Sequence, residues 1–516
     1  MEQITILWAD DEIDLLKPQL LFLEKKGYQL VTVTNGYDAI DEVTENKEID
    51  IVFLDESMPG LTGLEALPKI KEIRPSLPVI MITKNEAENV MEEALGAQIS
   101  DYLIKPVNPN QILLSLKKQT ENQRLVRERV AFDYQKEFRQ ILMEINSGLD
   151  HKEWVDIYKK IISWEIKIDS NSVEMGDILA MQKQEANNEF SKYVVKNYVD
   201  WVNSEDGPTF SSNLLRSKVF PLVNKDKPTV FLLLDNLRYD QWKMIQPTFS
   251  EFYRVQSEDH FYSILPTATQ YSRNAIFSGM MPGQIAKRFP DWWRNDNQEG
   301  GKNLFEHELL KELIKRTFRW DVKFDYHKIT NVSQAKILHD NIQNNLNNDF
   351  TVIVYNFIDM LSHARTEMEV LKELASDEKA YRSLTRSWFR NSPLWSALQK
   401  LAEHDINLVV STDHGTIRVN QPSKVIGDRE TTTNLRYKVG RNLQYQRKDV
   451  LEVRDPAKAG LPRPNVSSTF IFAKEDIFFL YPNNYNYYNN YYKNTFQHGG
   501  ISLEEMICPV ITMSSK

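Results

Sequence analysis

The segment Ile51-Val-Phe-Leu-Asp55 decides the fold of the first 120 residues, because an apolar run typical of a buried strand ends there in a carboxylate. Similar apolar runs alternate with segments of helical periodicity on both sides of it. The expected strands are Ile4–Trp8, Leu30–Thr34, Ile51–Leu54, Val79–Ile82 and Tyr102–Ile104, and the expected helices include Leu15–Leu23, Ala39–Val43, Leu64–Ile73 and Ala87–Leu95. This alternation predicts an α/β fold, a doubly wound parallel sheet with helices on both faces.

Polar residues stand at the expected carboxyl ends of these strands, where such sheets bind ligands. Asp10 and Asp11 follow the first strand, Asp55 the third, Thr83 the fourth and Lys105 the fifth. Three carboxylates at one edge repel each other unless a divalent cation lies among them, and Mg²⁺ prefers a few carboxylates with phosphate oxygens. A single Asp would more simply cap a helix. The whole set instead predicts an aspartate that forms an acyl phosphate.

This pattern resembles the receiver domain of two-component response regulators, and the resemblance covers residues 1–120. It implies phosphorylation of Asp55, Mg²⁺ binding by Asp10, Asp11 and Asp55, a switch hydroxyl at Thr83 and a phosphoryl contact from Lys105. Tyr102 matches the aromatic switch position of that family. A tyrosine packed into the strand explains the same residue equally well.

Length and charge divide the chain further. A chain of 516 residues is too long for one core, so two or more domains are expected. Residues 1–120 carry 11 basic and 21 acidic side chains, whereas the net charge of the whole chain is −9, which leaves the remainder nearly neutral. The acidic first part argues against nucleic-acid binding there.

The single cysteine, Cys508, and the lack of a secretion signal or membrane-spanning run predict a cytoplasmic protein.

Residues 121–205 are expected to form a helical connector, a small bundle of amphipathic helices. Apolar residues recur there at helical spacing, and no proline occurs between 121 and 202. A DNA-reading helix-turn-helix often follows a receiver, but the mixed charge of this segment disfavours one. We expect the connector to transmit a signal or set dimer geometry. The stretch Ser204-Glu-Asp-Gly-Pro208 marks its end.

Residues 206–516 repeat the feature of an apolar strand that ends in an acid. Val230–Leu234 runs into Asp235, Thr351–Tyr355 precedes Asp359, and Leu408–Thr412 runs into Asp413. Three histidines accompany these acids: His363, His414 and His498. Asp359 and His363 lie four residues apart, so one helical turn would place both on one face. Zinc accepts imidazole nitrogen and carboxylate oxygen, and two zinc ions suit in-line displacement at phosphorus.

Such a site also needs a nucleophile, and the segment Leu265–Gly279 supplies candidates. Thr269 is expected at the N-terminus of a short helix, where free N–H groups favour a phosphate. Metal coordination would lower the pKa of its hydroxyl and turn Thr269 into a nucleophile. Thr267 is the close competitor. A threonine before a helix is more often a cap, so this prediction rests on the whole set of residues.

The order of these motifs resembles the alkaline phosphatase superfamily, and in particular its nucleotide phosphodiesterase branch and the PglZ domain. The resemblance implies one zinc bound by Asp359, His363 and His498, and a second zinc bound by Asp235, Asp413 and His414, with Thr269 bridging them. The asparagine that follows the nucleophile in many diesterases is replaced by Ser272-Arg273-Asn274. Arg273, Asn274 or backbone N–H groups are therefore expected to bind the phosphoryl oxygens. Sulfatase chemistry is disfavoured because the matching residue is a threonine.

Two segments of the last domain carry no clear function in the sequence. Residues 424–463 hold 10 basic and 5 acidic side chains, with interspersed tyrosines. They could line a path for a polyanion or form a solvated surface loop. The Tyr/Asn-rich tract 481–492 is expected to be an irregular surface loop.

A receiver (1–120), a helical connector (121–205) and a PglZ-type phosphoesterase domain (206–516) in this order resemble the PorX response regulators. That resemblance implies phosphorylation by a sensor histidine kinase of the PorY type, dimerisation on phosphorylation and regulation of the type IX secretion system. We expect a zinc-dependent phosphodiesterase, a phosphoric ester hydrolase, that acts on nucleotides or oligonucleotides.

The alternative is a zinc-binding adaptor with vestigial catalysis that contacts a sigma factor or secretion components. A DNA-binding transcription factor is disfavoured because no reading helix is recognisable.

Overall fold

The computed structural model describes residues 4–84, 99–170, 175–204, 206–368, 375 and 377–516. The chain divides into two compact units: residues 1–137 with 167–176, and residues 138–166 with 177–516. The predicted boundary at residue 120 falls inside one long helix, α5 (Pro109–Asn146), whose residues from Phe138 onward belong to the second unit. Among the described residues, no helix is both long and apolar enough to cross a bilayer.

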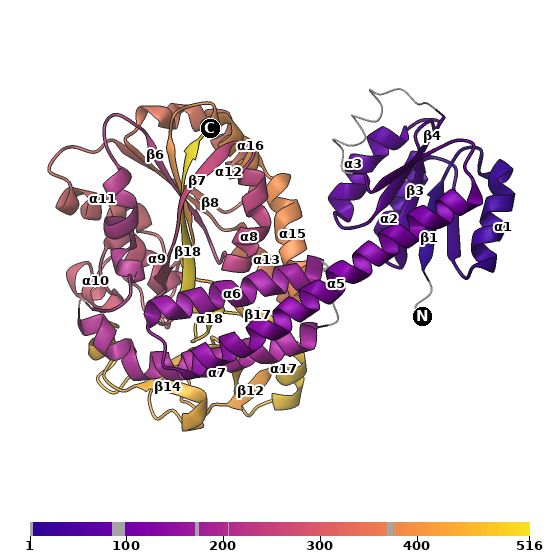
Figure 1. Cartoon of the computed structure of the whole chain (residues 1–516). Helices are drawn as coiled ribbons and strands as arrows, with labels where there is room; N and C mark the ends of the chain where they lie inside the picture. Colours follow the sequence, from indigo (N-terminus) through magenta and orange to yellow (C-terminus); the bar gives the residue numbers. More distant parts are fainter. Residues whose placement is uncertain (1–3, 85–98, 171–174, 205, 369–374, 376) are drawn as a thin grey trace. The chain divides into compact units, whose positions relative to one another are not determined.

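The first unit is built on a parallel sheet with strand order β2-β1-β3-β4-β5 (Figure 1). Its elements are β1 (Thr5–Ala9), α1 (Lys17–Lys25), β2 (Gln29–Val33), α2 (Gly36–Glu45), β3 (Ile49–Asp55), α3 (Gly63–Ile73), β4 (Val79–Thr83) and β5 (Asp101–Ile104), followed by α5. The five strands lie where the sequence predicts them, and the doubly wound α/β prediction is confirmed. The helix predicted at Ala87–Leu95 lies outside the described residues.

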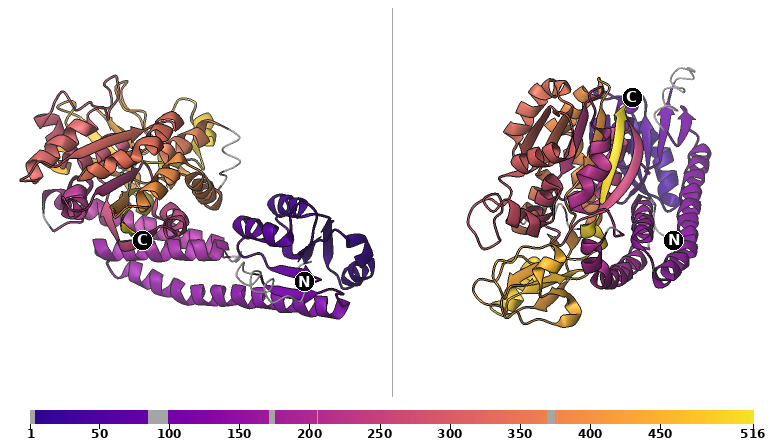
Figure 2. Two further views of the ribbon diagram at one scale, coloured as in Figure 1. Left: turned by 90° about the horizontal axis from the view of Figure 1, so that it is seen from above. Right: turned by 90° about the vertical axis from the view of Figure 1, so that its left-hand side faces the viewer.

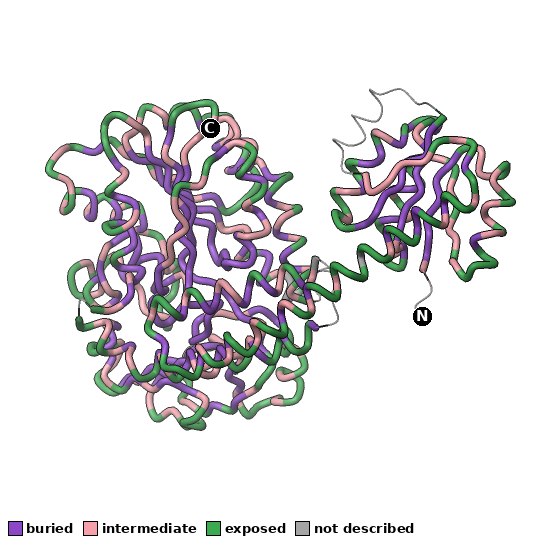
Figure 3. Tube along the Cα trace, in the orientation of Figure 1, coloured by how far each residue is buried: buried purple, intermediate pink, exposed green. Residues whose placement is uncertain are grey.

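The alternation of side chains along β3 explains why helices cover both faces of this sheet. Val52 and Leu54 pack with α2 and α3 on one face, whereas Ile51 and Phe53 pack with α1 and the start of α5 on the other. Successive residues of a strand point to opposite faces, so a continuous apolar run must be buried on both. The buried colouring of the strands in Figure 3 follows this pattern.

The second unit contains a mixed sheet of order β7-β18-β10-β6-β9-β8, with helices on both of its faces (Figure 2). Its elements are α6 (His151–Ser170), α7 (Gly176–Asn203), β6 (Thr229–Leu234), α8 (Tyr239–Phe249), β7 (Tyr253–Tyr262), α9 (Thr269–Ser278), α10 (Pro282–Arg288), α11 (Glu306–Thr317), β8 (Phe324–Ile329), α12 (Val332–Asn341), β9 (Phe350–Tyr355), α13 (Phe357–Glu367), α15 (Glu378–Arg390), α16 (Pro393–Ala402), β10 (Asn407–Ser411), β11 (Ile417–Arg418), β12 (Gln421–Lys424), β13 (Tyr437–Gly440), β14 (Val450–Val453), β15 (Thr469–Ala473), β16 (Ile477–Leu480), α17 (Tyr485–Tyr492), β17 (Phe496–Gln497), α18 (Leu503–Met506) and β18 (Ile507–Ser515).

The register of the three central strands brings their carboxyl ends level. β6, β9 and β10 run parallel, with Leu233 paired to Ser411 and Leu234 paired to Tyr355. Each strand is apolar and buried along its length, as a parallel strand covered on both faces must be. The residues that follow these strands therefore meet at one edge of the sheet.

Helix α7 is joined to the last part of the second unit by buried polar contacts. The Asn187 side chain donates to Glu504 (3.0 Å) and accepts from the backbone N–H of Leu503 (2.8 Å). Lys183 forms an ion pair with Glu504 at 3.1 Å. These contacts make most of the helical connector part of the second unit.

The tract 481–492 differs from its prediction. Tyr485–Tyr492 forms the helix α17 instead of an irregular loop. The rings of Tyr487 and Tyr491 stack with centroids 6.2 Å apart, as do those of Tyr488 and Tyr492 at 6.1 Å. Residues four apart meet on one face of a helix, so the tyrosine repeat favours helix through contacts between side chains.

Candidate active site

The receiver-like sheet gathers the predicted phosphorylation residues at one edge. One carboxylate oxygen each from Asp10, Asp11 and Asp55 lies within 4.8 Å of the other two. Asp10 and Asp55 are buried, whereas Asp11 is exposed and leaves the cluster open to solvent. This donor set suits Mg²⁺, which binds a few carboxylates and retains water or phosphate oxygens.

Lys105 and Thr83 border these carboxylates. The Lys105 ammonium lies 2.8 Å from Asp10 and 3.0 Å from Asp55. Thr83 is buried at the end of β4, and its hydroxyl donates to Glu56, the residue after Asp55. Both predicted side chains therefore lie beside Asp55. Tyr102 is half-buried and packs against the apolar cluster of α2 and α3, which fits either explanation of this residue.

The electrostatics of this edge favour a bound cation. Burial, with the carboxylates of Asp10 and Asp11, raises the pKa of Asp55 to about 6, although a hydrogen bond from Lys105 opposes the rise. A buried carboxylate with two like charges nearby is costly to ionise, and a divalent cation would offset that cost. The start of α3 also comes close, because a Cβ at Gly63 would lie 2.2 Å from the Asp55 carbonyl oxygen.

In the second unit, the level strand ends bring Asp235, Asp413 and His414 together. One ligand atom from each lies within 4.8 Å of the others, and all three side chains are buried. Gly415, the residue after His414, passes close to the backbone of Glu504, since a Cβ there would lie 2.0 Å from the Glu504 carbonyl oxygen. The three residues form a compact oxygen-and-nitrogen donor set of the kind that zinc accepts.

A second cluster contains Asp359, His363 and His498, and one ligand atom from each of these residues lies within 4.8 Å of the other two. Asp359 and His363 lie one turn apart on α13, and Asp359 Oδ1 is 3.5 Å from His363 Nε2. The His363 side chain is 62% exposed, so this cluster opens to solvent. The rings of His414 and His498 stack with centroids 4.3 Å apart, so the two clusters are adjacent.

Backbone carbonyls orient two of these histidines. His414 Nδ1 lies 3.1 Å from the Gly415 oxygen, and His498 Nδ1 lies 3.1 Å from the Thr267 oxygen. A ring N–H that donates to a carbonyl leaves the other nitrogen, Nε2, with a free lone pair toward the cluster, as in most metal-binding histidines. Burial and the nearby imidazoles of His414 and His363 hold the pKa of His498 well below its usual value, which favours this neutral form.

The two carboxylates of the buried cluster differ in their hydrogen bonds, because Asp413 accepts from the N–H of Asn236 and from Arg273 Nε, whereas Asp235 has no such partner. Neither oxygen of Asp235 accepts a hydrogen bond, although the Arg273 guanidinium contacts it as an ion pair. Burial raises the pKa of Asp235 well above its usual value, against the opposing charge of Arg273. Burial also disfavours ionised Asp413, but His414 and Arg273 lower its pKa to about 2. A buried carboxylate without hydrogen-bond donors, such as that of Asp235, is suited to bind a metal ion.

Thr269 and Thr267, the two candidate nucleophiles, differ in their surroundings. Thr269 is half-buried at the first position of α9, and its Oγ1 lies 3.1 Å from His414 Nε2. Thr267 is fully buried; its hydroxyl donates to the Gly500 oxygen (2.9 Å) and accepts from the Gly499 N–H (3.0 Å). The hydroxyl of Thr269 is accessible, whereas that of Thr267 holds the loop that carries His498.

We expect Thr267→Val to lower the free energy of unfolding by about 1–3 kcal/mol, because it leaves the buried N–H of Gly499 unpaired. Thr330→Val, at an exposed threonine, is the matched control and should change stability by less than about 0.5 kcal/mol. Urea denaturation of both variants measures the difference. Equal unfolding free energies for the two variants would contradict this role of Thr267.

The geometry favours structural roles for Arg273 and Asn274 over the predicted contact with phosphoryl oxygens. Arg273 is fully buried and contacts Asp235, Asp413 (3.1 Å) and Glu306 (3.6 Å), so it balances the charge of the buried cluster. Asn274 is buried and donates to the carbonyl oxygens of Gln270 (2.8 Å) and Lys302 (3.1 Å). Its amide N–H groups fix the loop that faces α9.

Sequence reasoning missed Asn236, which joins the two clusters. Its backbone N–H donates to Asp413, and its side-chain amide donates to Asp359, both at 3.3 Å. Asn236 adopts a left-handed φ of 66°, which Asn tolerates better than most residues. The Asp-Asn pair after an apolar strand is the sequence signal that could have indicated this position.

The basic insertion 424–463 is folded, with β13 and β14 on either side of β15 in one sheet. Arg436 is fully buried and ion-paired with Glu505 at 2.7 Å. Lys438 is also buried, and burial lowers its pKa to about 7. Tyr437 is buried as well. These three side chains therefore cannot line an exposed path for a polyanion.

Comparison with known families divides the chain as the motifs do. Residues 6–117 match the response regulator receiver domain, residues 124–202 the PorX response regulator linker domain, and residues 214–513 the BREX system PglZ alkaline phosphatase-like domain. A receiver domain implies a histidine kinase as phosphodonor, and domains of the receiver and alkaline phosphatase-like kinds generally bind metal ions.

Two relatives among the curated proteins each match about a quarter of the chain. The transcriptional regulatory protein ZraR of Klebsiella oxytoca is 35% identical over 124 residues, which are 24% of this chain and 28% of that protein. The transcriptional regulatory protein ResD of Bacillus subtilis is 32% identical over 112 residues, 22% of this chain and 46% of that protein. The chain thus spans about a quarter to a half of the length of these curated relatives.

Among solved structures, a response regulator receiver domain protein from Clostridium thermocellum is 29% identical, with a TM-score of 0.23. That match covers 24% of this chain and 98% of the other. The PglZ match alone covers more than half of the chain. The chain therefore belongs to the PglZ alkaline phosphatase-like family, and its receiver, linker and PglZ domains follow one another as in a PorX-type response regulator.

Proposed function

We propose that the second unit is a two-zinc phosphodiesterase, with Thr269 as nucleophile, that acts on nucleotide or oligonucleotide diesters. One observation carries this proposal: the accessible Thr269 hydroxyl lies 3.1 Å from His414 Nε2, beside two adjacent clusters of zinc-type ligands. A metal site with a purely structural role would not need a hydroxyl beside its ligands. The alternative of an adaptor with vestigial catalysis has no comparable support.

Asp235, Asp413 and His414 would hold one zinc, and Asp359, His363 and His498 the other. When bound, zinc supplies Lewis acidity at a phosphoryl oxygen and lowers the pKa of a nearby hydroxyl. The protein itself positions the hydroxyl of Thr269 for attack. Thr269 Oγ1, having given up its proton, would attack phosphorus as the bond to the leaving alcohol oxygen breaks and that oxygen takes up a proton. Water would then cleave the threonine–phosphate ester, which releases a phosphate monoester and restores the Thr269 hydroxyl.

The position of Thr269 supports an anionic substrate beside it. Ala268, the residue that caps α9, contributes no side-chain hydrogen bond, and its carbonyl accepts from the N–H of Tyr271, so the N–H groups of Thr269 and Gln270 are the ones that could face a phosphate. Arg273, one turn along, neutralises part of the carboxylate charge. We assign phosphoryl-oxygen binding to this helix start in place of Arg273 and Asn274.

We further propose that phosphorylation of Asp55 by a sensor histidine kinase, with Mg²⁺ at Asp10, Asp11 and Asp55, controls this hydrolase through dimerisation. The regulation of type IX secretion belongs to the same proposal, as does the cytoplasmic location. The helical connector supports a coupling of this kind. Asn187 on α7 contacts Leu503, five residues beyond His498, so a shift of α7 would act on the loop of the proposed zinc site.

The coupling is tested by measuring zinc-dependent diester hydrolysis with and without acetyl phosphate. We expect wild-type protein to respond and Asp55→Asn to show the same rate in both conditions, because the amide cannot form the acyl phosphate. Asp38→Asn, at an exposed acid of the same unit, is the matched control and should respond as wild type. A rate for the wild-type protein that acetyl phosphate leaves unchanged would contradict the coupling.

A further inference from the structure

Arg238, the residue before the first turn of α8, is fully buried and lies against the chain that follows His414. A Cβ placed on Gly415 would lie 3.3 Å from Arg238 Cγ. Arg238 Nη1 also donates a long hydrogen bond to the Thr416 carbonyl, at 3.5 Å. The position of this side chain therefore bears directly on the backbone next to His414.

The same guanidinium contacts the chain that leads to His498. It lies over the ring of Phe496, 5.2 Å from the ring centroid, within the range of a cation–π interaction. Phe496 belongs to β17, which pairs with β11, and the Thr416 hydroxyl joins the two chains again by donating to the Gln497 carbonyl at 3.0 Å. The guanidinium thus packs against a two-stranded ribbon, β11 with β17, that leads to one histidine of each proposed zinc cluster.

Two carboxylates hold the guanidinium in this position. Asp240 accepts from Arg238 Nε at 2.9 Å and pairs with Nη2, and Glu378 on α15 pairs with Nη2 as well. Burial opposes the ionisation of Asp240, but the charges of Arg238 and Arg382 hold its pKa below the usual value. Removing one partner of such a buried ion pair leaves a charge uncompensated, so this arrangement is costly to change.

The connector helices continue this set of charges. Arg382 on α15 donates to Asp240 at 3.1 Å and to Glu165 on α6 at 2.6 Å. Glu165 also pairs with Lys183 on α7, at 3.2 Å. Each of these four side chains is at most 14% exposed, so water and salt screen their charges little. Ion pairs therefore run without interruption from the connector to the guanidinium that contacts the ribbon.

We infer that Arg238 is a positioning residue for the proposed zinc site, and that the connector holds it in place through Arg382 and Asp240. This inference rests on the proposed function and deepens the regulation of that site. Groups that orient metal ligands from behind commonly change metal affinity about 10–100-fold when they are lost. A shift of α6 would move Arg382, and with it the carboxylate that holds Arg238.

Arg238→Lys tests the positioning role, because lysine keeps the positive charge but has one donor group and no planar face to lie over Phe496. Competition with a chromophoric chelator measures the zinc affinity of the full-length protein. We expect Arg238→Lys to weaken this affinity about tenfold and to lower kcat for bis(p-nitrophenyl) phosphate, with KM little changed, because Arg238 is buried away from substrate.

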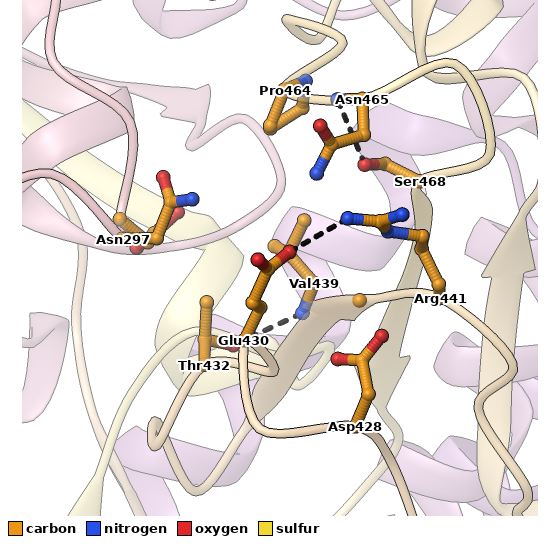
Figure 4. A pocket seen from close by; sticks show the side chains of 11 residues that line it. Asn297, Asp428, Glu430, Thr432, Val439, Arg441, Pro464, Asn465 and Ser468 are labelled. Atoms are coloured by element: carbon orange, nitrogen blue, oxygen red, sulfur yellow. Dashed lines mark hydrogen bonds and ion pairs between the residues drawn. The ribbon is translucent and has the colours of Figure 1, made fainter.

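The matched control is Arg441→Lys, at an arginine that pairs with Glu430 at 2.8 Å in the insertion (Figure 4). It should keep the zinc affinity and kcat of the wild type. Wild-type zinc affinity in Arg238→Lys would overturn the inference. Should Arg238→Lys not fold, Phe496→Leu takes its place, since it removes the ring beneath the guanidinium but keeps an apolar side chain, and an unchanged affinity there would overturn the inference equally.

A double-mutant cycle tests the link to the connector. Glu165→Gln removes the charge that Arg382 meets on α6, and we expect it to weaken zinc binding about threefold in the wild-type background. The same change should have little effect in Arg238→Lys, because the contact that it supports is already lost. Glu185→Gln, at an exposed acid of α7, is the control and should keep the wild-type affinity in both backgrounds.

No effect of Glu165→Gln in the wild type, or an equal effect in both backgrounds, would overturn the link to the connector. Zinc affinity also separates this inference from the proposed function. A wild-type protein that binds zinc without hydrolysing diesters contradicts the proposed function alone, and the affinities of the variants still decide the inference. A wild-type protein that binds no zinc contradicts both.

Discussion

Replacing Thr269 by alanine is expected to lower kcat/KM for diester hydrolysis roughly 10³-fold or more, because it removes the proposed attacking atom. The hydroxyl is accessible and lies 3.1 Å from His414 Nε2. Alanine keeps the helix start, since the capping contacts of α9 do not involve the Thr269 side chain. Initial rates on bis(p-nitrophenyl) phosphate measure the loss.

Thr269→Ser is the matched variant, because it retains a hydroxyl at the same atom. We expect it to keep measurable hydrolysis and both variants to keep the zinc content of the wild type, since the six histidine and aspartate residues proposed as ligands remain. If Thr269→Ala hydrolyses diesters as fast as Thr269→Ser, a different nucleophile operates and this assignment is wrong. An adaptor would keep its biological output in Thr269→Ala, whereas a hydrolase would lose it.

Replacing His498 by alanine is expected to remove about one zinc ion per chain and to abolish most diester hydrolysis. His498 Nε2 lies 3.8 Å from Asp359, and its Nδ1 is fixed on the Thr267 carbonyl, so no other side chain can take its place without moving the loop. Loss of one of three protein ligands weakens zinc binding strongly. Metal analysis after gel filtration measures the ion content, and rates are measured on the same sample.

His404→Ala is the control for this experiment, because His404 is exposed and lies in neither cluster. It should keep the wild-type zinc content and rate. An unchanged zinc content in His498→Ala would show that the Asp359 cluster is not a zinc site.

Several of the candidate ligands could be predicted to meet, because they stand at the end of an apolar strand or one helical turn from another candidate ligand. Asp235 and Asp413 follow buried strands whose parallel register makes their ends level. Asp359 and His363 share one turn of α13. In these cases short-range spacing determines position, so a linear pattern was enough to predict that the residues meet.

Other features depend on contacts between distant segments, which spacing does not encode. Asp296 meets Tyr437 across 141 residues, and no motif surrounds either residue. Arg273 was expected at the substrate, but the buried carboxylates of Asp235 and Asp413 attract its guanidinium inward. The helix α17 was missed because composition alone suggested an irregular loop there.

Anomalous diffraction at the zinc absorption edge, from crystals of the zinc-loaded protein, tests the central claim most directly. We expect two anomalous peaks about 4 Å apart, one bound by Asp235, Asp413 and His414 and the other by Asp359, His363 and His498, with Thr269 Oγ1 beside them. A single peak, or no peak at these six side chains, would contradict it.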